Sequence, residues 1–127
     1  MPSTRTKRSV AYARTASRQQ ADRGAIERQL RACRRAASER GLTLAQEFAD
    51  DGASGLTLER AALRELLAYV AANPVDYVIC SDAARLARDY QLFRSLMRQL
   101  RTCQARVIFA DDVSRDATTV AQSRERS

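Results

Sequence analysis

Two apolar periodicities alternate along this 127-residue chain, and their order constrains the fold more than any other feature. Short segments with apolar residues at every second position, or in an unbroken run, predict strands. These segments are 9–13, 42–48, 75–80 and 105–110. Longer segments with apolar residues at helical spacing predict helices at 21–40, 59–72 and 90–102. Strict alternation of strands and helices is typical of a parallel sheet with helices on both faces.

We therefore predict one α/β domain over residues 9–112, built in three layers around a mostly parallel, four-stranded sheet. Residues 1–8 are expected to form a disordered basic arm, and the polar residues 113–127 a disordered tail. In parallel sheets, ligands bind beyond the carboxyl ends of the strands. Functional side chains should therefore follow the strands directly.

The composition excludes several common sites. The chain has no histidine, so it can hold no Ser-His-Asp triad, and it lacks both the GxxxxGK[ST] and GxGxxG phosphate-binding patterns. Its three cysteines lie far apart, without zinc-ligand spacing, and we expect reduced thiols in a cytoplasmic protein. No apolar run approaches the roughly 20 residues that span a bilayer, so no membrane partner is expected.

Positive charge is concentrated at one end of the chain. Residues 1–40 contain 11 Lys and Arg against 3 Asp and Glu, whereas residues 41–127 contain 11 against 12. A basic region of this kind suits a polyanion such as DNA. Arginine also outnumbers lysine by 21 to 1, so a codon bias that produces a solvated basic surface explains the excess equally well.

Charged and polar residues follow each predicted strand. They are Arg14, Asp50, Asp51, Ser54, Arg85, Arg88, Asp111 and Asp112. Arg85 and Arg88 are three residues apart, and on a helical turn they would share a face. Together with Arg14 they could clamp a phosphate through bidentate hydrogen bonds. In the alternative interpretation, each arginine pairs with a neighbouring carboxylate such as Asp82 or Asp89.

Five motifs give these positions a more specific meaning. They are YARTAS (12–17), IERQ (26–29), DDGASG (50–55), ERAAL (59–63) and RLARD (85–89). In order and spacing they resemble the catalytic domain of serine site-specific recombinases of the resolvase and invertase type. The resemblance covers residues 9–112 and implies DNA strand cleavage and rejoining through a 5′-phosphoserine intermediate, with no metal or other cofactor.

The resemblance also implies roles for individual residues. Arginines of that family stabilise the charge that develops on the phosphate, and the matching positions here are Arg14, Arg60, Arg85 and Arg88. Tyr12, Gln20 and Ser54 match family positions that bind the DNA phosphate. The family works as dimers and tetramers on DNA, so DNA and further recombinase subunits are the implied partners.

The nucleophile position departs from the family. Ala16 stands where the family has its catalytic serine, and a methyl group cannot attack phosphorus. Ser17 is the adjacent hydroxyl, but neighbouring residues of an extended chain point to opposite faces, so it could act only if the loop shifts by about one residue. Ser9 and Ser81 are more remote candidates. In a second departure, Ala84 replaces an aspartate that often precedes the family's RLxR arginine, although Asp82 lies two residues earlier.

Three functions can be considered for this sequence. The first is a recombinase catalytic domain of a mobile genetic element, active in DNA integration, resolution or inversion. The second is a catalytically silent, truncated relative that binds DNA or pairs with a full-length recombinase, since the family's long dimerising helix and DNA-binding domain are not recognisable. A receiver-like domain using Asp50 and Asp51 is disfavoured, because such domains keep a lysine late in the chain and the only lysine here is Lys7.

Overall fold

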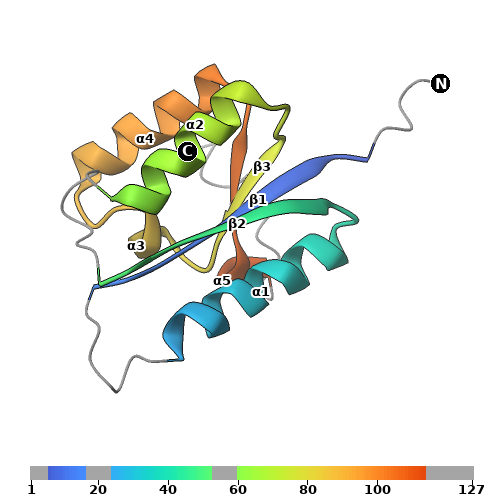
Figure 1. The fold of residues 1–127 in the computed structure, drawn as a ribbon, viewed down its shortest axis with the longest axis horizontal. Helices are drawn as coiled ribbons and strands as arrows, with labels where there is room; N and C mark the ends of the chain where they lie inside the picture. The colour runs from blue at the N-terminus through green and yellow to red at the C-terminus, as the bar shows by residue number, and fades with distance from the viewer. Residues whose placement is uncertain (1–5, 17–23, 53–59, 114–127) are drawn as a thin grey trace.

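The structure, a computed structural model, describes residues 6–16, 24–52 and 60–113. Four strands alternate with helices along the described chain (Figure 1). The strands are β1 (Arg8–Thr15), β2 (Thr43–Asp51), β3 (Tyr77–Cys80) and β4 (Arg106–Phe109). The helices are α1 (Ala25–Glu39), α2 (Ala61–Ala72), α3 (Ala83–Leu86), α4 (Tyr90–Thr102) and α5 (Ala110–Val113).

The four strands form one sheet in the order β2-β1-β3-β4, and all three pairings are parallel. The longest pairing, between β1 and β2, runs from Arg8 beside Thr43 to Thr15 beside Asp51. Because every strand runs in the same direction, the carboxyl ends of β1, β2 and β3 meet at one edge of the sheet. The residues that follow those strands are thereby brought together.

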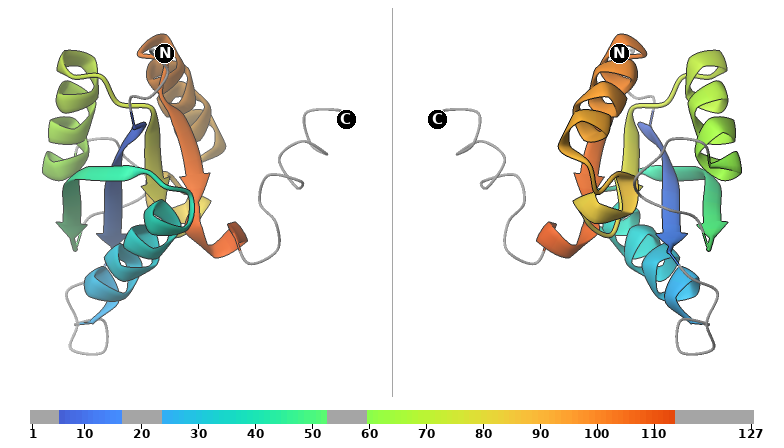
Figure 2. Two further views of the ribbon diagram at one scale, coloured as in Figure 1. Left: turned by 90° about the vertical axis from the view of Figure 1, so that its right-hand side faces the viewer. Right: turned by 90° about the vertical axis from the view of Figure 1, so that its left-hand side faces the viewer.

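Helices cover both faces of the sheet, and each face has its own apolar core. In Figure 1, α2 and α4 lie above the sheet and α1 lies below it, and Figure 2 shows the same layers from two sides. Val10 and Tyr12 of β1 pack against α2 and α4 in one core. Ala11 and Ala13, the alternate residues of β1, pack against α1 in the other. This alternation follows from the two-residue period of a strand.

The predicted fold class is confirmed, and the sheet is entirely parallel rather than mostly so. The helix expected at 90–102 has those limits. The helix expected at 59–72 begins later, at Ala61, because Arg60 is extended and a carboxylate from β2 caps the first turn. Two four-residue helices, α3 and α5, were not predicted, since one helical turn leaves no periodic pattern. The predicted arm (1–8) and tail (113–127) are each too long by at least one residue, because Arg8 pairs with Thr43 in β1 and Val113 ends α5. Residues 1–5 and 114–127 lie outside the described residues.

Two helices end in the same hydrogen-bonded motif, with a different residue at the strained position. After α1, Gly41 has φ 70° and donates its N–H to Ser38. After α4, Gln104 has φ 64° and donates its N–H to Arg101. In each case the next residue donates back to a carbonyl of the last turn, as in a Schellman motif. Left-handed backbone suits glycine and strains a residue with a Cβ.

Substitutions at these two positions should have opposite effects on the stability of the domain. Gln104→Gly should raise the free energy of unfolding by about 0.5–1 kcal/mol, because it removes the Cβ strain at a positive φ. Gly41→Ala should lower it by about 1 kcal/mol, although no other atom lies within 4 Å of the new Cβ. Urea unfolding measures both changes. A loss of stability in Gln104→Gly would show that the glutamine side chain stabilises the turn more than the backbone is strained.

Candidate phosphate-binding site

The candidate site lies at the carboxyl edge of the sheet, on the face covered by α2 and α4. Tyr12 and Arg14 of β1 point to this face and are almost completely buried, with 0% and 1% of their surface exposed. Arg60, the residue before α2, is also buried, at 2% exposure. Arginines are rarely so deeply buried without partners, so the contacts of these two guanidinium groups define the site.

Asp50 is the acidic anchor of the site. Its carboxylate accepts hydrogen bonds from the Tyr12 hydroxyl (2.7 Å) and from the backbone N–H groups of Ala62 (2.8 Å) and Leu63 (2.9 Å). The two N–H groups belong to the first turn of α2, where no intrahelical acceptor exists and negative charge is favoured. Asp50 therefore joins β1, β2 and α2 and is fully engaged in structure.

Arg60 and Arg14 both donate to the backbone around α3. Arg60 Nη1 donates to the Tyr12 hydroxyl (3.2 Å) and to the carbonyl of Arg85 (3.1 Å), and its Nη2 donates to the carbonyl of Leu86. Arg14 Nε donates to the same carbonyl of Arg85 (3.0 Å), and its Nη2 to that of Ala84 (2.7 Å). A four-residue helix cannot satisfy these carbonyls itself, so the two buried guanidinium groups hold α3 in place.

Arg85 and Arg88 form the outer part of the cluster. Arg85 is half-buried, its Nη1 donates to the carbonyl of Arg14 (3.3 Å), and its Nε has no hydrogen-bond partner within the described ranges. Arg88 is exposed. The expectation that Arg85 and Arg88 share a helical turn is wrong, because α3 ends at Leu86 and Ala87 is extended. They approach the site from a helix and from the loop after it.

Two neighbouring aspartates cap helices at this edge of the sheet. Asp82 accepts the N–H of Ala84 (3.0 Å) as the cap of α3, and its nearest approach to Arg85 is 3.7 Å. Asp89 accepts the N–H of Gln91 (2.7 Å) as the cap of α4. Both acids serve as helix caps, and Asp82 also forms a salt bridge with Arg85, as the alternative of arginine–aspartate pairs expected for that residue.

Mutual repulsion within the cluster is visible in its electrostatics. Burial lowers the pKa of Arg14, and the positive charges of Arg60, Arg85 and Arg88 lower it further. Burial raises the pKa of Tyr12, and its hydrogen bond to Asp50 adds to that effect, so the phenol stays protonated and can donate. Four arginines thus lie close enough to repel one another, which is an arrangement that an anion stabilises.

Two positioning contacts were missed by sequence reasoning. Gln29 of α1 accepts the backbone N–H of Arg14 and donates to its carbonyl, both at 3.0 Å, and is 6% exposed. A glutamine on the apolar face of a predicted helix, within the IERQ motif, was the available signal. Thr15 Oγ1 donates to Asp51 (2.5 Å) and accepts the N–H of Gly52 (3.0 Å). The end of β1 is therefore held from both sides.

Position 16 lies next to the cluster. Ala16 is exposed and follows β1 directly, two residues after Arg14. Three predicted site residues, Ser17, Gln20 and Ser54, lie outside the described residues. Ser9 lies near the start of β1, at the opposite end of the strand from this edge, and its hydroxyl donates to the carbonyl of Thr43.

The cysteines offer no alternative nucleophile at this edge. Burial raises the pKa of the Cys33 thiol to about 12, and burial also raises the pKa of Cys80. Both thiols are therefore protonated and unreactive near neutral pH. Across the three described ranges, no three His, Cys, Asp or Glu side chains gather as metal ligands, and no helix is long and apolar enough to cross a membrane.

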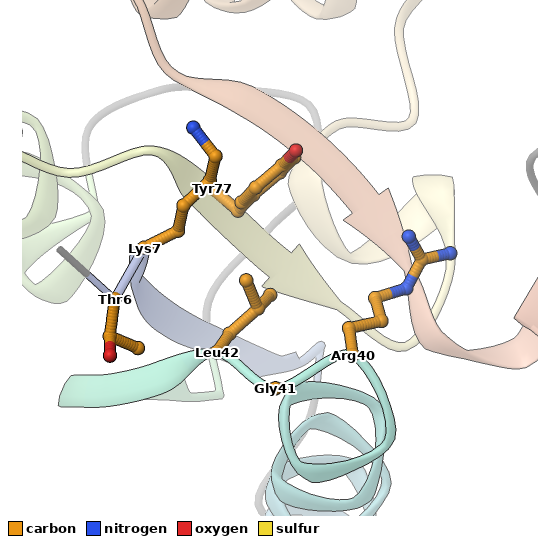
Figure 3. Close-up of a pocket in the computed structure, with 6 residues that line it drawn as sticks. All are labelled: Thr6, Lys7, Arg40, Gly41, Leu42 and Tyr77. Carbon is orange, nitrogen blue, oxygen red and sulfur yellow. The ribbon is translucent and has the colours of Figure 1, made fainter. Parts of the chain in front are cut away.

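A pocket lies at the opposite edge of the sheet. It has a volume of about 400 Å³ and is lined by Thr6, Lys7, Arg40, Gly41, Leu42 and Tyr77 (Figure 3). These residues precede or begin β1, β2 and β3. The pocket is therefore separate from the arginine cluster, and no residue predicted from the motifs lines it.

An all-parallel α/β domain with an arginine cluster at the carboxyl edge is the arrangement expected of a serine recombinase catalytic domain. Solved structures with this fold include the N-terminal catalytic domain of TP901-1 integrase (TM-score 0.77, 24% identity, 84% of this chain and 79% of that one). A resolvase family site-specific recombinase from Streptococcus pneumoniae is similar over 95% of this chain and 90% of its own (TM-score 0.75, 17% identity). The C-terminal catalytic domain of IS1535 TnpA, an IS607-like serine recombinase, is 28% identical (TM-score 0.64, 87% of this chain and 78% of that one).

The family model described as "Resolvase, N terminal domain" matches residues 9–124, so the chain belongs to that family. By family and fold it is a site-specific recombinase catalytic domain, as the five motifs predicted. A comparison with curated protein sequences gives no match.

The central hydrogen bonds of the site predict a stability effect. Tyr12→Phe removes the hydroxyl that lies between Asp50 and Arg60, and should lower the free energy of unfolding by about 1–2 kcal/mol. The matched control is Tyr77→Phe, whose hydroxyl makes no hydrogen bond to another described residue and which should change stability by less than about 0.5 kcal/mol. Urea denaturation of both variants measures the difference. Equal effects would mean that the Tyr12 hydroxyl does not stabilise the site.

Proposed function

We propose that this domain binds a DNA phosphodiester at the arginine cluster during site-specific recombination, and that with Ala16 in place it does not break the strand. One observation carries the binding proposal: four arginines gather at the carboxyl edge of the sheet, and one of them, Arg88, is exposed. A phosphate would place negative charge beside this concentration of guanidinium groups.

The arginines divide into an inner and an outer pair. Arg14 and Arg60 are buried and donate to backbone carbonyls, so we assign them to positioning α3. Arg88 is exposed, and Arg85 is half-buried with its Nε 3.7 Å from Asp82. We assign these two to direct contact with the phosphate oxygens. A rigid α3 fixes their positions before DNA arrives, which reduces the entropy lost on binding.

The absence of cleavage follows from the end of β1. A serine at position 16 would form an Oγ–phosphorus bond, the bond from phosphorus to the 3′ oxygen would break, and that oxygen would leave as a hydroxyl. Thr15 is held by Asp51 and Gly52, which opposes a shift of the chain that would bring Ser17 into this position. Since reacting atoms must align within about 3–3.5 Å, an alanine here leaves the charge stabilisation without a nucleophile.

The lack of a nucleophile at position 16 suggests how such a domain is used. We place it in a dimer or tetramer on DNA, in which other recombinase subunits supply the catalytic serines. Cleavage and rejoining by this chain itself, with Ser17 as the nucleophile, is the second reading, and the adduct experiment below separates the two.

Binding by phosphate contacts predicts weak, salt-sensitive affinity. Titration of a labelled duplex should give dissociation constants of about 10⁻⁴–10⁻⁶ M that are independent of sequence and weaken steeply with salt. The logarithm of the binding constant falls with the logarithm of the salt concentration, and Arg88→Gln should reduce the magnitude of this negative slope by about 1. Arg28→Gln, which removes an exposed arginine on α1, is the control and should leave the slope nearly unchanged. Tight, salt-insensitive binding to one sequence would contradict the proposal.

The nucleophile assignment predicts a gain of function. A chimera in which this domain replaces the catalytic domain of a complete serine recombinase should form no covalent adduct with a nicked recombination site. Ala16→Ser should create a 5′-linked protein–DNA adduct, and a further Ser17→Ala change should not abolish it. The parent recombinase serves as the positive control on the same gel.

Two results would count against this assignment. Adduct formed by the unmodified domain and lost in Ser17→Ala would identify Ser17 as the nucleophile and make the domain an active enzyme. No adduct from Ala16→Ser, while the parent recombinase reacts, would show that the arginine cluster does not present a phosphodiester to position 16.

A further inference from the structure

The outer face of α4 carries positive charge that the arginine cluster does not account for. Arg94, Arg98 and Arg101 are all exposed, and the helix from Tyr90 to Thr102 contains no acidic residue. Because residues 41–127 contain nearly equal numbers of basic and acidic residues, the composition alone does not reveal this positive face. We call these three arginines the α4 stripe.

The stripe is linear. With about 100° of rotation per residue, the three arginines fall within roughly 60° of the helix circumference, and Tyr90 lies within roughly 20° of that arc. From Arg94 to Arg101 the helix rises about 10 Å, which corresponds to about three nucleotides along one strand of B-DNA. The spacing therefore suits consecutive backbone phosphates better than a single compact anion.

Nothing in the described part of the chain neutralises the stripe. No carboxylate there lies within 4.0 Å of Arg94, Arg98 or Arg101. Arg94 lies over the Tyr90 ring, 5.8 Å from its centroid. Tyr90 is 72% exposed and is the one large apolar side chain that the described surface presents so openly. A row of arginines that begins at an exposed aromatic ring is typical of nucleic-acid surfaces.

The stripe also begins at the arginine cluster. Asp89, the cap of α4, follows Arg88 directly, so the first turn of the helix lies at the carboxyl edge of the sheet. From there α4 runs back along the sheet on the same side as α2 (Figure 1). Positive charge thus extends from the cluster along the outer face of the domain.

We propose that the α4 stripe binds the DNA backbone flanking the phosphate held at the arginine cluster. This proposal rests on the proposed function, because it extends the path of the same DNA. A second copy of this chain is a poorer partner, since its described carboxylates are largely engaged. Glu27 and Glu47 contact Arg34, and Asp50 caps α2.

Helix α1 provides a matched control on the other face of the sheet. Arg28, Arg31 and Arg35 are exposed along it at a similar spacing, but Arg31 lies 3.7 Å from Glu27, and α1 carries two acidic residues. Removing three arginines from either helix lowers the net charge equally. Only the location of the lost charge differs.

The experiment compares two triple variants of the full chain by titration of a labelled duplex between about 50 and 200 mM salt. Arg94→Gln, Arg98→Gln and Arg101→Gln together should lower the salt slope by about 2.7, the value for three phosphate contacts, and weaken binding at least about tenfold at the lowest salt. The corresponding triple variant of Arg28, Arg31 and Arg35 should lower the slope by less than about 1. Glutamine and arginine have similar helix propensities, so both variants should stay folded.

A charge-preserving variant provides the positive control. Arginine-to-lysine changes at all three stripe positions should retain the salt slope, because lysine also neutralises one phosphate. Equal losses in the α1 and α4 triple variants would overturn the proposal, since net charge alone would then explain the binding. Unchanged duplex binding by the α4 variant, with loss of binding to polyglutamate, would also overturn it and point to an acidic protein partner.

Failure of this proposal is distinguishable from failure of the proposed function. If Arg88→Gln lowers the salt slope and the α4 triple variant does not, the arginine cluster binds DNA and the stripe does not. If the α4 triple variant lowers the slope and Arg88→Gln has no effect, DNA binds along α4 without engaging the cluster.

Discussion

One buried carboxylate organises the functional edge of this domain. Asp50 accepts the hydroxyl of Tyr12 and two N–H groups of α2, and so connects three elements that are distant in the sequence. The Tyr12 hydroxyl in turn accepts from Arg60, whose guanidinium reaches the carbonyls of α3. Each group in this hydrogen-bond network provides a partner for the next group. Breaking a buried network of this kind leaves charges and donors unpaired, which costs more than the lost hydrogen bond alone.

The two buried arginines have a structural role that does not compete with phosphate binding. Their guanidinium groups satisfy carbonyls that a single turn of helix leaves unpaired. In doing so they hold in place the helix that carries Arg85. The mutual repulsion of the cluster is the cost of this arrangement, and under the proposed function a bound phosphate would relieve it. On that proposal, fold stability and affinity for an anion depend on the same residues.

A site built in this way can keep its electrostatics when its nucleophile is absent. The arginines depend on Asp50, Tyr12 and Gln29 for their positions, and none of these contacts involves position 16. An alanine there removes a reactive oxygen without disturbing the cluster. Under the proposed function, phosphate binding and strand cleavage are separable in this fold, because the buried hydrogen bonds that position the arginines do not depend on a hydroxyl at the end of β1.

The sequence by itself determined the order of the elements, the parallel sheet and the edge at which the site lies, because those follow from local apolar periods and from the short connections between strands. It also located the arginines, through motifs in register. The helical limits of α4 could be predicted since its pattern spans several turns. Only the tertiary structure decided that Arg14 and Arg60 are buried and support α3, and that Arg85 lies in α3 whereas Arg88 lies in the loop after it. The tertiary structure also decided that Gln29 binds the backbone of β1 and that Asp50 caps α2. Most of those facts rest on hydrogen bonds between residues 12 to 71 positions apart, and such contacts leave no periodic trace in the chain.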